Sequence, residues 1–292
     1  MKKNLLVSIF LIAAFSTASA ADKLRITSFS TILTEIAEKV GGDHVIVSGL
    51  VRPGIDPHEY EPTPSDLKRV GDAQLILTAG KHLENYLNKL QEASGGKADL
   101  LKVGDHLPDL TMKAEDGGST ALDPHWWNSV RNVEQATRVV RDELIKLDPA
   151  AQADFAQNAT VYLAELDDLN RWVRSKVAEL PRDRRKLVTS HDAFQYFARD
   201  YGFSISAIEG VSTETEPSNR RVADLIDRIK KEQVKAIFTE STLNPKVTKE
   251  ITRETGAKIG GELYADGLGA GDASTYAGMV KHNVATIVDA LK

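Results

Sequence analysis

Three histidines and one aspartate carry the most obvious chemistry in this sequence. His58 and His125 each end an Asp-Pro-His triplet, His191 lies just after a strand-like stretch at 186–189, and Asp266 precedes a glycine. Neutral imidazole suits zinc and its neighbours among the transition metals, and a carboxylate compensates part of the metal charge. We therefore predict that these four side chains form a tetrahedral site for a divalent transition metal, with no coordination position left open for water.

Each motif also has an ordinary structural interpretation. Taken singly, each histidine fits a loop or strand end at which the ring bonds to a neighbour, and Asp-Gly is a common turn. The prolines before His58 and His125 fix the local backbone and make the rings easier to immobilise. We expect three aspartates beside the histidines to accept hydrogen bonds from nearby backbone or ring N–H groups: Asp56, Asp123 and Asp192.

A long helix over residues 148–181 is the element expected to position these side chains. Asp148 and Pro149 form a helix start, and Pro181 forms a stop. Apolar residues between them recur at spacings of three and four, which predicts one buried face: Phe155, Ala159, Tyr162, Leu163, Leu166, Leu169, Trp172, Val173, Val177 and Leu180. At about 1.5 Å per residue the helix would be nearly 50 Å long, so we expect it to join two lobes. The alternative is a long core helix within one domain.

Strand and helix patterns alternate on both sides of this helix. Strands are expected at 24–29, 44–50, 73–78, 99–103, 186–189, 204–208, 236–239 and 258–260. Helices are expected at 32–40, 64–70, 83–92, 130–147, 193–201, 219–231, 245–255 and 273–291. The stretch 114–121 has the composition of a loop. The predicted fold class is α/β with two lobes, each a mostly parallel sheet flanked by helices, joined by one long rigid helix. Loops at the carboxyl ends of the strands would then face each other across a cleft.

The first residues have the layout of a secretory signal peptide. Lys2 and Lys3 precede an apolar run over 5–15, and Ala18-Ser19-Ala20 follows, so we expect cleavage after Ala20. The expected division is therefore a signal peptide (1–20), an N-terminal lobe (21–147), the linking helix (148–181) and a C-terminal lobe (182–292). The sequence has no cysteine, so we expect neither disulfides nor a lipid-modified cysteine, and a protein free in the periplasm. A net charge of −5 disfavours nucleic acid and anionic membranes as partners.

Longer motifs resemble those of a known family across essentially the whole mature chain. They are Gly54-Ile-Asp-Pro-His-Glu-Tyr-Glu-Pro62 with Pro64-Ser-Asp66, Asp123-Pro-His125-Trp, Val188-Thr-Ser-His-Asp-Ala-Phe194 with Tyr196-Phe197, Glu209-Gly-Val-Ser-Thr213, and Glu240 with Leu263-Tyr-Ala-Asp266. The chain resembles the periplasmic metal-binding proteins of zinc/manganese ABC importers, also called cluster A-I or the TroA-like superfamily. The resemblance implies two α/β lobes joined rigidly by one long helix, and places the family's ligand positions on His58, His125, His191 and Asp266.

The resemblance implies a solute-binding protein rather than an enzyme. We expect a monomer that carries one metal ion as transported ligand to a membrane permease driven by a cytoplasmic ATPase, and a periplasmic metallochaperone is a further possible partner. Zinc is the favoured ion, because manganese and iron carriers often have glutamate where this chain has His191, and a third imidazole makes the site softer. Manganese or iron is the alternative, since manganese-binding relatives with three histidines and an aspartate are known.

The chain departs from common patterns of the family in two places. The zinc-uptake branch often has a long loop rich in histidine and acidic residues, whereas the corresponding stretch here, Asp105–Leu122, has His106 as its only histidine. This weakens any role of the loop in collecting metal. The sequence after His125 is Trp126-Trp127-Asn128, where an aliphatic residue commonly follows the histidine. We interpret both tryptophans first as packing residues, one of which could also shield the site.

Two other classes of protein are weaker alternatives. A metal-dependent hydrolase would need an open coordination position and a base, for which Glu59 is the obvious candidate. A surface adhesin would need an anchor, which the cysteine-free sequence does not provide. Solvated or packing roles are expected for the remaining histidines and for three glutamates: His44, His82, His106, His282, Glu59, Glu209 and Glu240. The alternative for His106 is an accessory contact with the metal. The alternative for the three glutamates is support or substitution of the ligands.

Overall fold

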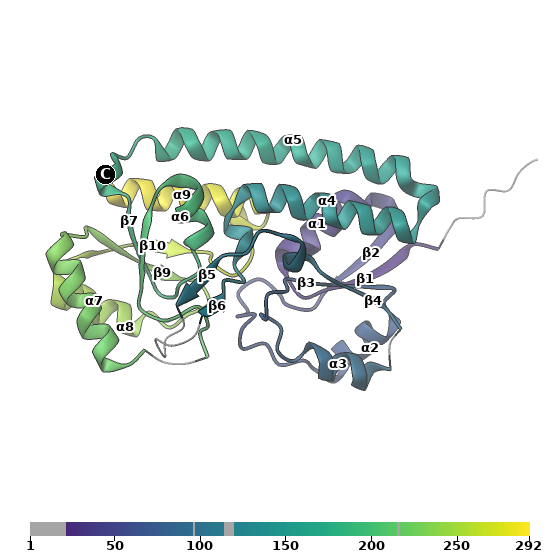
Figure 1. Cartoon of the computed structure of the whole chain (residues 1–292), viewed down its shortest axis with the longest axis horizontal. Coiled ribbons are helices and arrows are strands. Elements are labelled where there is room, and N and C mark those ends of the chain that lie inside the picture. The colour runs from purple at the N-terminus through teal and green to yellow at the C-terminus, as the bar shows by residue number, and fades with distance from the viewer. Residues whose placement is uncertain (1–21, 96, 114–119, 215–216) are drawn as a thin grey trace, which may run out of the picture.

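One long helix runs along both halves of the molecule (Figure 1). We describe a computed structural model, which covers residues 22–292 except 96, 114–119 and 215–216; the predicted signal peptide lies outside these residues. Helix α5 spans Gln152–Val177 and packs against α1 (Thr31–Gly41) and α4 (Val130–Leu147) in one half and α9 (Tyr276–Leu291) in the other. The prediction that it joins two lobes is therefore confirmed.

Helix α5 is shorter than the predicted range of 148–181. Asp148 and Pro149 start a 3-10 turn instead, in which the Asp148 side chain accepts a hydrogen bond from Ala150 N–H (3.2 Å). At about 1.5 Å per residue its 26 residues span about 40 Å. The predicted apolar face is buried except at Leu163 and Trp172, which are half-buried. Asn170 is also buried on this face and accepts a hydrogen bond from Tyr201 (2.9 Å).

The first lobe is built on a four-stranded parallel sheet in the order β2-β1-β3-β4. Its elements are β1 (Leu24–Ser28), α1, β2 (Val45–Gly49), α2 (Pro64–Asp72), β3 (Leu75–Thr78), α3 (Leu87–Ser94), β4 (Asp99–Lys102) and α4. One face of the sheet packs against α1 and α4, which α5 covers in turn. The other face packs against α2 and α3 through a smaller cluster that contains Phe29, Val70 and Ile76.

The second lobe contains two parallel strand pairs, β7–β8 and β9–β10, rather than one continuous ladder. Strands β7 and β9 lie in contact, so the pairs adjoin. The elements are β7 (Lys186–Thr189), α6 (Gln195–Tyr201), β8 (Ser204–Ala207), α7 (Asn219–Glu232), β9 (Ala236–Glu240), α8 (Lys246–Thr255), β10 (Lys258–Leu263) and α9. Parallel strands with helices on both sides confirm the predicted α/β fold.

Several short elements and one helix start differ from the prediction. Strands β5 (Thr111–Lys113) and β6 (Thr120–Leu122) pair antiparallel where the sequence indicated only a loop. Strands of three residues are too short to show a period of two. Helix α3 begins at Leu87 rather than at residue 83. The Glu84 carboxylate instead accepts hydrogen bonds from the backbone N–H groups of Ala79 (2.6 Å) and Gly80 (3.1 Å), and a turn in which Leu87 N–H donates to the Glu84 carbonyl (3.3 Å) precedes the helix. The 3-10 turns are η1 (Gly42–His44), η2 (Val103–His106), η3 (Trp126–Asn128), η4 (Pro149–Ala151), η5 (Arg182–Arg184) and η6 (Gly271–Ala273).

Across the part of the chain that the structure describes, no helix combines the length and the apolar character that a membrane crossing requires.

Candidate metal centre

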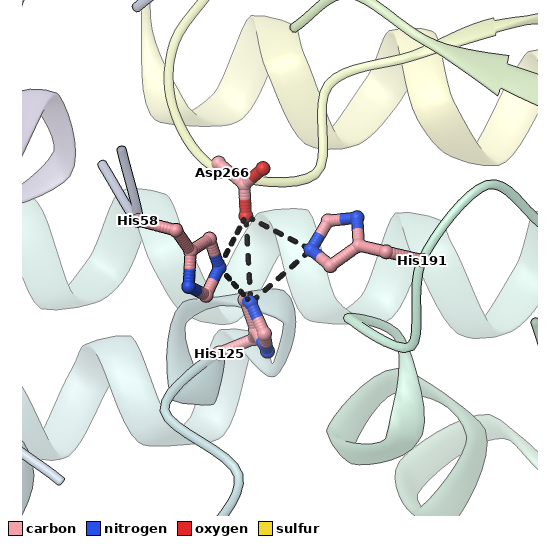
Figure 2. A group of neighbouring side chains, drawn as sticks. All are labelled: His58, His125, His191 and Asp266. Atoms are coloured by element: carbon pink, nitrogen blue, oxygen red, sulfur yellow. Dashed lines mark hydrogen bonds and ion pairs between the residues drawn. The ribbon is translucent and has the colours of Figure 1, made fainter. Parts of the chain in front are cut away.

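The four residues singled out in the sequence meet between the two lobes (Figure 2). His58 lies in the loop between β2 and α2, and His125 directly precedes η3. His191 follows β7, and Asp266 follows β10. Each half of the molecule thus supplies two of the side chains from its loops. The structure brings the four residues together, as the sequence predicted.

The four potential ligand atoms have the separations that a small cation requires. The Nε2 atoms of His58 and His125 are 3.0 Å apart, and those of His125 and His191 are 3.3 Å apart. Oδ1 of Asp266 lies 3.3 Å from His191 Nε2, 3.4 Å from His125 Nε2 and 3.9 Å from His58 Nε2. Ligand atoms about 2.0–2.1 Å from a zinc ion lie about 3.3 Å apart in a tetrahedron. Since all four atoms lie within 4.8 Å of one another, a small shift of the His58 ring would complete a tetrahedron of ligand atoms.

Asp266 presents an unsatisfied oxygen to this cluster. Its side chain is buried, and Oδ1 has no hydrogen-bond partner within residues 22–292 as described. Its other oxygen, Oδ2, accepts a long hydrogen bond from Thr242 (3.4 Å). A buried carboxylate is costly unless it faces a positive charge, which here is either the His191 ring when protonated, 3.3 Å away, or a bound cation. The oxygen therefore marks the position at which a cation would be stabilised.

Both Asp-Pro-His motifs form the same local turn. The side chain of Asp56 accepts a hydrogen bond from the backbone N–H of His58 (2.8 Å), and that of Asp123 accepts one from the backbone N–H of His125 (2.9 Å). These are Asx turns, with proline at the position where a fixed φ favours the turn. The expected support of the two histidines by Asp56 and Asp123 is thus present, and it explains the repeated triplet.

Two ring hydrogen bonds select the histidine tautomers. Nδ1 of His125 lies 2.8 Å from Asp123 Oδ1, and Nδ1 of His191 forms a short hydrogen bond with Glu240 Oε2. A neutral ring that donates from Nδ1 presents the lone pair of Nε2, which is the arrangement found at metal sites, and a protonated ring reaches it by losing the proton on Nε2. Glu240 was one of three candidates for this role. Asp192 was expected to contribute as well, but its side chain accepts from Gln195 (2.8 Å), because it lies at the start of α6.

Burial and charge set different protonation states for the rings. Burial lowers the pKa of His58 to about 3, against the opposing effect of the Asp266 carboxylate. Burial acts in the same direction on His191, but the carboxylates of Glu240 and Asp266 outweigh it and hold the pKa of this ring well above its usual value. For Asp266, burial is outweighed by the neighbouring His191, so its pKa lies below the usual range. The cluster therefore combines a neutral His58, a protonated His191 and an ionised Asp266.

Trp126 and Trp127 pack in the interior behind His125. Both are almost fully buried, and their indole N–H groups donate to Ala79 O (2.9 Å) and Ala265 O (2.7 Å), respectively. The Trp127 ring also contacts the His125 ring edge-to-face, with centroids 5.4 Å apart. The packing interpretation is therefore correct for both, and Trp127 also walls one side of the cluster.

The remaining histidines lie apart from the cluster. His44 bonds to Asp154 (2.8 Å), His282 bonds to the carbonyl of Glu262 (2.9 Å), and His82 and His106 are exposed. His82 lies in a turn rather than at the start of a helix. Glu59, the candidate base for a hydrolase, is exposed. Glu209 is half-buried, and its carbonyl accepts a hydrogen bond from Arg221 (2.7 Å).

The fold and the cluster together define a substrate-binding component of a metal transporter, and comparisons with known proteins agree. Residues 26–290 match the family described as ZnuA, the periplasmic component A of the zinc-uptake complex. The chain therefore belongs to this family of periplasmic metal-binding ABC transporter components. Members of the family bind a substrate for transport and are not enzymes, so the hydrolase alternative is set aside.

Relatives of the chain carry different metals in their names. It is 36% identical over 286 residues to the zinc-binding protein TroA of Treponema pallidum, covering 94% of this chain and 92% of that protein. It is 34% identical over 277 residues to the manganese-binding lipoprotein MntA of Halalkalibacterium halodurans, covering 94% and 91%. It is 31% identical over 284 residues to the iron-binding protein YfeA of Yersinia pestis, covering 97% and 91%. The structure of TroA, 34% identical over the aligned region, superposes with a TM-score of 0.86 and covers 92% of this chain and 99% of that one.

Proposed function

We propose that this protein captures one divalent transition-metal ion between its lobes, with His58, His125, His191 and Asp266 as the ligands. The observation that carries this proposal is the buried Oδ1 of Asp266, which forms no hydrogen bond within the described residues and faces three imidazole Nε2 atoms. Four protein ligands around one ion would leave no position for a reactive water, as expected for a site that holds metal rather than uses it in catalysis.

Zinc is the ion that we propose. Three imidazoles and one carboxylate give a borderline-soft set with low charge, which suits zinc better than manganese. The separations near 3.3 Å also correspond to the edges of a zinc tetrahedron. Manganese is the alternative ion, and iron is another, because relatives of comparable identity are named for manganese and iron binding.

The same proposal extends to partners and location. The protein would work as a monomer in the periplasm, after cleavage of the signal peptide following Ala20, with lobes at 21–147 and 182–292 and the link at 148–181. It would deliver its ion to a membrane permease coupled to a cytoplasmic ATPase, and it could receive that ion from a periplasmic metallochaperone. Because α5 packs against helices of both lobes, we expect modest rocking of the lobes rather than wide opening.

A competition titration tests the proposed function. Protein from Ala21 onward is stripped with a chelator, supplied with zinc and an excess of manganese together, and analysed for bound metal. We expect one equivalent of zinc in the parent and in His282→Ala, a variant of a histidine outside the cluster, and none in His191→Ala. Retention of manganese at comparable affinity would favour the manganese alternative. Failure of the parent to bind either metal stoichiometrically would overturn the four-ligand site.

A further inference from the structure

The side chain of Asn128 crosses from one lobe to the other beside the metal centre. It is 7% exposed and lies at the end of η3, whose first residue follows His125. Its amide nitrogen, Nδ2, lies 3.0 Å from the carbonyl oxygen of Ala193 and 3.1 Å from that of Ala265. Two carbonyl acceptors at these distances require the NH2 end of the amide between them. Both donor hydrogens of one side chain are thus committed to the second lobe.

The first of these carbonyls belongs to the turn that carries His191. Ala193 lies two residues after His191, and its N–H donates back to the His191 carbonyl (3.1 Å). The Thr189 hydroxyl donates to the same carbonyl (2.8 Å). These two hydrogen bonds tie Ala193 to the backbone of His191, so a shift at Ala193 would be transmitted to His191.

The second carbonyl directly precedes Asp266. Ala265 O accepts from Asn128 and also from the Trp127 indole N–H (2.7 Å). Tyr276 adds a bond in the opposite direction, from its hydroxyl to Trp127 O (2.7 Å). Trp127 and Asn128, which follow His125 in the first lobe, therefore hold the peptide next to the aspartate ligand in the second.

We propose that Asn128 is a positioning residue for metal capture: its amide fixes the Ala193 and Ala265 carbonyls and thereby sets His191 and Asp266 at their distances from His125. This inference rests on the proposed function, because it assumes that these side chains bind the ion. A metal site needs its ligands held in place by the groups behind them. Asn128 would supply this support from the first lobe to two loops of the second.

The amide is well suited to this role because it carries two donors and no charge. An aspartate at this position would place a carboxylate beside two carbonyl oxygens, and a leucine would leave both carbonyls without the donor. In either case the loops of His191 and Asp266 would lose the hydrogen-bond donor that they share. We expect a more open coordination sphere, into which water could enter as an additional ligand.

The test compares Asn128→Leu and Asn128→Ser with Asn170→Leu in the full mature protein. Asn170 on α5 is 8% exposed and accepts a hydrogen bond from the Tyr201 hydroxyl of α6. Its replacement therefore removes a hydrogen bond of a similarly buried side-chain amide without touching the ligand loops. Zinc affinity is measured by competition with a chelator, and the visible absorption spectrum is recorded with Co2+ bound alone, because its intensity reports coordination number. The serine hydroxyl can donate to one carbonyl and provides a milder variant if the leucine variant does not fold.

We expect Asn128→Leu to weaken zinc binding about 10- to 100-fold and to reduce the Co2+ absorption, with Asn128→Ser between it and the parent. Asn170→Leu should lower thermal stability but keep the parental affinity and spectrum. Parental affinity and spectrum in the folded Asn128 variants would overturn the inference, and so would an equal loss in Asn170→Leu. A parent that binds neither zinc nor Co2+ would instead overturn the proposed function, and this inference with it.

Discussion

Glu240, the last residue of β9, accepts hydrogen bonds from both the backbone N–H and the ring Nδ1–H of His191. One carboxylate therefore fixes the position of this histidine and the direction of its Nε2 lone pair. Glu240 ends β9 of one strand pair, and His191 follows β7 of the other, so the contact also links the two pairs of the second lobe.

Replacement of Glu240 by glutamine should weaken metal binding. A glutamine side chain can accept from only one of the two donors and presents an NH2 group to the other. We expect zinc affinity to fall about 10- to 100-fold, as is usual when a residue that supports a metal-bound histidine is lost. Competition with a chelator measures the change. Glu262→Gln, at an exposed position on neighbouring β10, is the matched control, and equal affinities in the two variants would contradict the assigned role.

Zinc binding at pH 7 should release protons. The raised pKa of His191, caused by Glu240 and Asp266 against the effect of burial, keeps this ring protonated in the metal-free protein, and the ion must displace the proton from Nε2. His58, with its pKa lowered to about 3 by burial, is already neutral and contributes none. Affinity should therefore still rise with pH above 7 and fall as the solution is acidified. Calorimetry in buffers of different protonation enthalpy measures the release, and a binding heat independent of the buffer would disprove it.

Metal should stabilise the folded chain. The ligands come together only after folding, so zinc at a free concentration of 100 times its Kd should add about 2.7 kcal/mol to the free energy of unfolding. For a chain of this size we expect the Tm to rise by about 5–10 °C. Thermal unfolding with and without zinc measures the shift. The same rise in His191→Ala would show that zinc acts elsewhere on the protein.

Packing under α5 should affect stability without affecting the metal centre. Phe155 is fully buried on this helix and contacts His44 edge-to-face, with ring centroids 5.5 Å apart. Phe155→Ala should lower the free energy of unfolding by about 3–5 kcal/mol, because it leaves a cavity. Val161→Ala on the exposed face of the same helix should change it by less than about 0.5 kcal/mol. Urea unfolding measures both effects, and a more than tenfold loss of zinc affinity in folded Phe155→Ala would contradict the separation.

Regular periodicity made most of the fold predictable. The bounds of α4 and β7 coincide with those predicted, because both elements have strong patterns and clear ends. Strands β5 and β6 were missed because each has only three residues. The late start of α3 accompanies hydrogen bonds between the Glu84 carboxylate and the backbone of Ala79 and Gly80, for which the sequence carries no clear signal.

The meeting of the four residues of the cluster was predictable to a greater extent than the contacts that support them. Repeated Asp-Pro-His triplets are a local signal, and the Asx turns that they form are local as well. Glu240 and Asn128 act on residues that lie far from them in sequence, with separations of 49 between Glu240 and His191 and 137 between Asn128 and Ala265. Such pairs depend on how the lobes meet, which no short pattern in one sequence reveals. For that reason Glu240 was only one candidate among three, Asp192 was assigned wrongly, and Asn128 was not singled out.

The spacing of the four proposed ligands has a consequence for when the cargo can be taken up. Neighbouring ligands along the chain are separated by 67 residues between His58 and His125 and by 66 between His125 and His191. Asp266 comes later still, in the loop that follows β10 of the other strand pair. No short stretch of polypeptide contains more than one of them, so a nascent or extended chain offers the ion no more than isolated side chains. A chain that crosses a membrane unfolded could not carry its metal with it, and loading must await the compartment in which the protein folds.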